Sequence, residues 1–77
     1  MSDKMVDVTV HIDESIDAEA RAGVQNRLLE MAGVLAATSH DERPHLMVVE
    51  YDPERTSSQA ILAEVQASGV HAELVGL

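Results

Sequence analysis

Cysteine is absent from this 77-residue sequence, and Tyr51 is its only aromatic residue. Without cysteine the chain can form no disulfide, no thiolate metal site and no cysteine nucleophile. A single aromatic side chain gives no platform on which nucleic-acid bases could stack. The core must therefore be built from aliphatic residues and methionine, and the fold must be held by packing alone.

Basic residues are also scarce, with five Lys and Arg against 14 Asp and Glu and a net charge of -9. Binding to phosphate backbones or to anionic membranes depends on clustered Lys and Arg. No apolar run approaches the length of a membrane span, and no secretory signal is visible. We therefore expect a cytoplasmic protein with no nucleic-acid or membrane partner. The charge suits a cation or a basic protein.

The first half of the chain predicts a strand, a helix and a second strand. Apolar and polar residues alternate over Val6–Ile12, which is the period of a half-buried strand. Residues 18–32 have helical spacing, with Asp17 as the N-cap and Gly33 ending the helix. The predicted apolar stripe comprises Ala20, Val24, Leu28 and Met31, and the polar side comprises Arg21, Gln25 and Glu30. A weaker strand is predicted over residues 34–39.

The second half repeats this order. A charged turn is predicted over residues 40–44 and a strand over residues 45–52. A second helix follows, with Thr56 as its predicted cap and Gly69 at its end. A last strand is predicted over residues 70–77. Right-handed crossovers then place the strands in the order 4-1-3-2. We predict one α+β domain over residues 1–77, a ferredoxin-like βαββαβ sandwich whose antiparallel sheet carries both helices on one face.

Three stretches carry a family resemblance: residues 28–34, residues 49–54 and residues 67–73. They resemble the heavy-metal-associated domain of copper chaperones and metal-transporting ATPases, over nearly the whole chain. The resemblance implies the same fold, and it implies that Asp17 and Ala20 stand at the two positions of the family's CxxC metal-binding motif. Copper(I) prefers thiolate or thioether ligands. We therefore expect this chain not to carry copper(I).

Histidines are the strongest candidates for another metal site. The predicted topology brings all four to one sheet edge, where the resembling family binds metal. Imidazole and carboxylate together suit zinc, nickel, cobalt or copper(II). The predicted ligands are His11 and His71, on neighbouring strands, with Asp13 or Glu14 and then His40 and His45. The alternative is that these are four ordinary solvated histidines.

A second hypothesis assigns the domain to protein interaction. Leu46, Val48 and Val75 are predicted to face away from the helices, and three apolar residues on one open sheet face indicate a contact surface. In this interpretation the chain keeps only the fold and binds a protein partner or associates weakly with itself. The serines lack a defensible His/Asp arrangement and the glycines are scattered, so we do not expect an enzyme.

Overall fold

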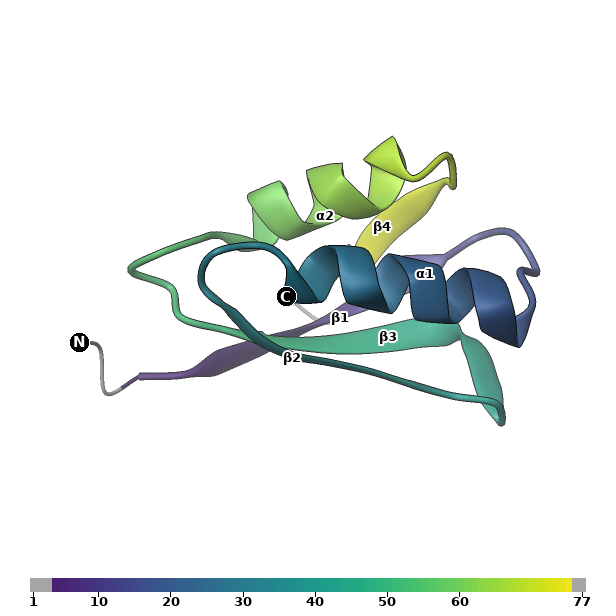
Figure 1. Cartoon of the computed structure of the whole chain (residues 1–77), viewed down its shortest axis with the longest axis horizontal. Coiled ribbons are helices and arrows are strands. Elements are labelled where there is room, and N and C mark those ends of the chain that lie inside the picture. Colours follow the sequence, from purple (N-terminus) through teal and green to yellow (C-terminus); the bar gives the residue numbers. More distant parts are fainter. Residues whose placement is uncertain (1–3, 76–77) are drawn as a thin grey trace.

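A computed structural model of the chain describes residues 4–75, which form two helices packed on one face of a four-stranded sheet (Figure 1). The elements in chain order are β1 (Val6–Ile12), α1 (Ala18–Leu29), β2 (Val34–His40), β3 (Arg43–Tyr51), α2 (Ser58–Ala67) and β4 (Ala72–Val75). The sheet order is β2-β3-β1-β4 with antiparallel pairing throughout. This is the predicted order read from the other end, so the ferredoxin-like fold is confirmed.

The core lies between the sheet and the helices. Val8, Val10 and Ile12 of β1 point inward, whereas Val6 at the start of the same strand is exposed. The inner positions of β3, one residue of β2 and the apolar sides of the helices complete the core; these residues are Met47, Val49, Tyr51, Ala37, Val24, Leu28, Ile61 and Val65. The period-two and helical patterns therefore located most of the core, because inward side chains alternate along a strand and recur every three or four residues on a helix.

The face that α1 turns toward the core differs from the prediction at two positions. Arg21, predicted on the polar side, is buried, whereas Ala20, predicted in the apolar stripe, is exposed. The Arg21 side chain packs its apolar stem inward and extends its guanidinium to the carbonyl of Ile16 and the carboxylate of Asp41. A long charged side chain can thus occupy an inward position that a hydrophobicity pattern assigns to solvent.

Several element boundaries also differ from the prediction. Helix α1 ends at Leu29 with Glu30 as its C-cap, so Gly33 does not end it. Gly33 instead has a φ of +94° after a short turn, and a Cβ there would lie 2.9 Å from the Cβ of Arg55. The N-cap of α2 is Ser57 and not Thr56, because the Ser57 hydroxyl accepts from the amide of Ala60. Asp17 caps α1 as predicted.

The strand ends shift as well. The turn between β2 and β3 is shorter than residues 40–44, because His40 pairs with Arg43 and only two residues remain between the strands. Pro44 therefore lies inside β3, near the start of the strand. Among the described residues strand β4 covers Ala72–Val75, so it begins at Ala72 and not at residue 70. Gly76 and Leu77 of the predicted last strand lie outside the described residues.

Candidate metal centre

His11, Asp13 and Glu73 form a cluster at the edge of the sheet where β1 ends and β4 begins. The register places His11 of β1 directly opposite Glu73 of β4. The Nδ1 atom of His11 lies 3.1 Å from Oδ1 of Asp13 and 3.8 Å from Oε1 of Glu73. One nitrogen and two carboxylate oxygens, one from each residue, all lie within 4.8 Å of one another. This is a donor set that a divalent transition-metal ion accepts.

The cluster is open to solvent, and its charge is negative. The side chains of His11, Asp13 and Glu73 are 37%, 52% and 67% exposed. The cluster places two carboxylate side chains beside one imidazole, and the whole chain has a net charge of -9. Such a site attracts cations and leaves room for water or another ligand on a bound ion. Nδ1 of His11 and Oδ1 of Asp13 lie within hydrogen-bond distance, and a metal must compete with protons for the imidazole nitrogen that it binds.

His45 lies beside this cluster without being part of it. Its ring stacks on that of His11, with centroids 5.6 Å apart and an interplanar angle of 16°. Its Nδ1 lies 2.7 Å from the carbonyl oxygen of Ile12. A carbonyl only accepts hydrogen bonds, so Nδ1 of His45 carries the proton and holds the ring against the end of β1. His45 therefore supports the position of the His11 ring.

His71 and Glu14 form a separate pair, which we call the Glu14–His71 latch. Oε2 of Glu14 lies 2.5 Å from Nδ1 of His71, and Oε1 accepts from the backbone amide of His71 at 2.8 Å. The amide of Asp13 in turn donates to the carbonyl of His71 at 2.9 Å. These three bonds fasten the loop after β1 to the residue before β4. The latch therefore holds Asp13 near His11 and Glu73.

The latch shifts the ionisation of both partners. The side-chain hydrogen bond to His71 lowers the pKa of Glu14 from its ordinary value of 4.5. The same bond, helped by the negative charge of Glu14, raises the pKa of His71 from its ordinary value of 6.5. Both changes favour the ion pair, because each partner stabilises the charged form of the other.

The structure thus separates the predicted ligands into four groups. His11 and Asp13 join the cluster, His71 and Glu14 form the latch, and His45 stacks on His11. His40 stands apart, exposed at the end of β2. Glu73 was not among the predicted ligands. The alternation of Glu73 with Ala72 and Leu74 places Glu73 on the face of the sheet away from the helices. Only the strand register shows that Glu73 lies opposite His11.

The two positions that the family resemblance assigns to cysteine hold no metal donor pair. Asp17 is the N-cap of α1, and its Oδ1 accepts from the amide of Ala20 at 2.8 Å. Ala20 has no donor atom in its side chain and is exposed. A soft copper(I) ion has no thiolate there, since the sequence contains no cysteine.

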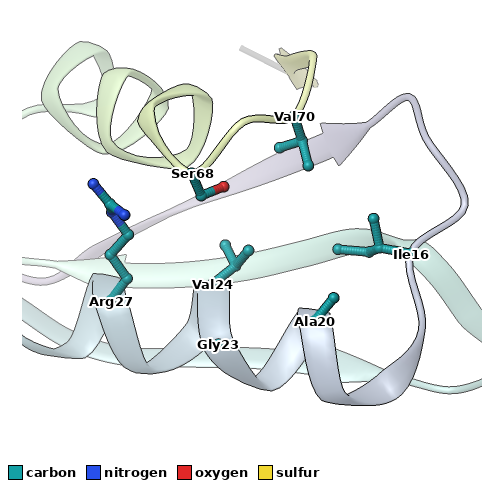
Figure 2. Close-up of a pocket in the computed structure, with 7 residues that line it drawn as sticks. All are labelled: Ile16, Ala20, Gly23, Val24, Arg27, Ser68 and Val70. Carbon is teal, nitrogen blue, oxygen red and sulfur yellow. The ribbon is translucent and has the colours of Figure 1, made fainter.

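A surface groove of about 310 Å³ lies elsewhere, between α1 and the segment that joins α2 to β4 (Figure 2). Ile16, Val24 and Val70 point toward this space. The two polar side chains that line the groove form hydrogen bonds within the protein. Arg27 pairs with Glu64, and the Ser68 hydroxyl donates to the carbonyl of Val65 at 2.6 Å. The groove is therefore mainly apolar and contains none of the four histidines.

Among residues 4–75, no helix is long and apolar enough to cross a bilayer. The sequence matches no protein-family model and no curated protein sequence.

Solved structures do match. The Cu(I)-loaded N-terminal domain of a potential copper-translocating P-type ATPase from Bacillus subtilis is 22% identical, with 95% of this chain and 90% of that chain covered and a TM-score of 0.85. Oxidized MerP from Ralstonia metallidurans is 18% identical, with 95% and 100% covered and a TM-score of 0.84. A copper-binding domain from a P-type ATPase is 21% identical, with 91% and 93% covered and a TM-score of 0.83.

These likenesses establish the fold. The described residues have the architecture of the heavy-metal-associated domains found in copper chaperones and transport ATPases, as the sequence resemblance implied. The chain combines this fold with a sequence that has no cysteine.

Proposed function

We propose that this domain binds a divalent transition-metal ion, of the class of zinc, nickel, cobalt or copper(II), through His11, Asp13 and Glu73. The observation that carries the proposal is the convergence of one imidazole nitrogen and two carboxylate oxygens within 4.8 Å of one another. The fold supports it, because similar folds carry copper. The ligand chemistry here is harder than thiolate, which favours a divalent ion over copper(I).

Titration calorimetry with zinc and nickel tests this proposal. The parent should bind one ion per chain, and His11→Ala should lower the affinity at least about tenfold, because it removes the only nitrogen donor of the cluster. His40→Ala is the matched control, since it removes an exposed histidine outside the cluster and should bind as the parent does. Equal affinities for the parent and His11→Ala, or an equal loss in His40→Ala, would contradict the proposed site.

Protein interaction is the second candidate function, and one observation favours it. Val48 and Val75 are 39% and 42% exposed, and both lie opposite Thr9 on the face of the sheet that the helices leave open. Leu46 lies in the next row of the same face, opposite His11. A partner of either kind, a second copy or another protein, would cover this surface. Light scattering of the metal-free protein over a wide concentration range tests self-association directly.

A further inference from the structure

The metal cluster and the apolar residues lie on one continuous surface, which we call the outer face. The strand register arranges this face in rows across the sheet. Thr38, Val48, Thr9 and Val75 form one row, Leu46, His11 and Glu73 form the row toward the cluster, and Ala36, Glu50 and Asp7 form the row on the other side. The cluster is therefore at the rim of the outer face, one row from its exposed valines.

The cluster alone leaves a metal ion short of ligands. Zinc takes four ligands, and the cluster supplies one nitrogen and two oxygens, one from each of its three residues. The exposure of these side chains leaves the remaining coordination position open to an approaching molecule. A ligand from a second molecule that covers the outer face would reach the ion there.

The outer face is too small and too acidic to hold two copies together without help. Four strands of four to nine residues, spaced about 4.8 Å apart, give a flat footprint of about 900 Å² for two apposed faces. Specific interfaces bury about 1,200–2,000 Å². Asp7 and Glu50 face each other directly across β1 and β3, so apposed copies would bring further like charges together.

We propose that a divalent metal ion bound at His11, Asp13 and Glu73 joins two copies of this chain through their outer faces. The inference rests on the proposed metal site. In a two-fold pair the same patch meets itself, so each cluster keeps its own ion and a carboxylate oxygen of the facing cluster completes the coordination. Packed sheets lie about 10 Å apart, a gap that side chains from both copies and metal–ligand bonds of about 2 Å can span. The bound dication also offsets the carboxylate charge of the cluster.

Sedimentation velocity of the full chain, with EDTA or with equimolar zinc chloride, tests the inference. The protein should sediment as a monomer in EDTA and as a dimer in zinc. Val48→Glu adds a negative charge at the centre of both faces and should raise the dimer dissociation constant more than about tenfold, since like charges across an interface are costly. Leu29→Glu is the matched control: Leu29 is 45% exposed on α1, away from the outer face, and its variant should dimerise as the parent does.

Calorimetry at protein concentrations below the dimer range separates the two proposals. If the parent binds no zinc, the metal site itself is wrong, and the dimer fails with it. If the parent binds zinc but remains a monomer at every concentration, the metal site stands and the dimer is overturned. A dimer that persists in EDTA, that survives Val48→Glu, or that grows into larger oligomers also overturns it. Zinc binding by Val48→Glu should remain within about twofold of the parent, because Val48 supplies no ligand.

Discussion

His11 of β1 lies directly opposite Glu73 of β4, so the imidazole of His11 meets a carboxylate and not the ring of His71. His71 stands two residues earlier in the chain, where it is fastened to Glu14. If β4 were shifted by two residues, His71 would lie opposite His11 and the site would hold two histidines. In the observed register the site holds one histidine and two carboxylates. The harder donor set favours divalent ions with mixed nitrogen and oxygen coordination.

Glu73→Gln should weaken zinc binding at least about tenfold, because the amide keeps the shape of the side chain and loses its negative charge. Glu50→Gln is the control, since Glu50 lies on the same face but two rows from His11. The measurement is competition against a coloured zinc chelator. A loss in Glu50→Gln as large as that in Glu73→Gln would mean that the overall charge of the face attracts zinc and that no specific ligand does.

The Glu14–His71 latch should support the metal site without supplying a ligand. Glu14→Gln removes the ion pair while leaving an oxygen that can still accept from the His71 amide. We expect a loss of zinc affinity smaller than that in His11→Ala, up to about tenfold, since partners that orient metal ligands have effects of this order. In the histidine NMR spectrum, zinc should then broaden or shift His11 far more than His71. The opposite pattern would show that His71 is the ligand.

The latch should also make stability depend on pH. The pKa of His71 is raised from 6.5, so its contribution is complete below 6.5 and is lost as pH rises through the raised value. The pKa of Glu14 is lowered from 4.5, so its contribution is complete above 4.5 and is lost as pH falls through the lowered value. The ion pair therefore stabilises the fold most between pH 4.5 and 6.5.

Urea unfolding in EDTA checks this dependence. The difference in unfolding free energy between the parent and His71→Ala should be larger at pH 5.5 than at pH 9. The variant keeps the backbone amide that Glu14 also contacts. A difference that is constant across this range would assign the effect to packing of the ring and not to its charge.

Copper(I) binding should appear in the double variant Asp17→Cys with Ala20→Cys. Both positions lie at the start of α1, where two thiolates would give a soft metal its preferred ligands. Loss of the Asp17 cap should cost about 1 kcal/mol of stability. Copper(I) competition against bathocuproine measures the gain, with Asp17→Ser plus Ala20→Ser as the control. A folded double-cysteine variant without tight copper(I) binding would show that the assigned positions are wrong.

Arg21 should stabilise the fold mainly through its buried stem. Its side chain is only 8% exposed, and its guanidinium joins α1 to Asp41 in the turn between β2 and β3. Arg21→Ala should lower the unfolding free energy by about 2 kcal/mol, and Arg21→Met should lose less, because methionine keeps most of the packing. Urea unfolding measures both. Equal losses would assign the effect to the charge of Arg21.

The fold could be predicted from the sequence because its signals are local. The alternation of Val6–Ile12, the cap at Asp17 and the spacing of Val24 and Leu28 each follow from the period of one element. Two short βαβ units in sequence then leave few right-handed arrangements of four strands. The errors at Arg21 and Ser57 are also local. The apolar stem of Arg21 is long enough to be buried while its charged end stays hydrogen-bonded. Thr56 and Ser57 both carry a hydroxyl that could cap α2, and Ser57 is the one that does.

From the sequence alone it follows that the chain has no thiolate, and the alternation along the strands puts Leu46, Val48 and Val75 on the open face. Which side chains contact one another depends on the pairing of the strands in the folded chain. Alternation fixes the face on which Glu73 lies, but pairing registers that differ by two residues leave every side chain on the same face. The register, set by the loops and by packing against the helices, brought Glu73 to His11 and left His71 with Glu14.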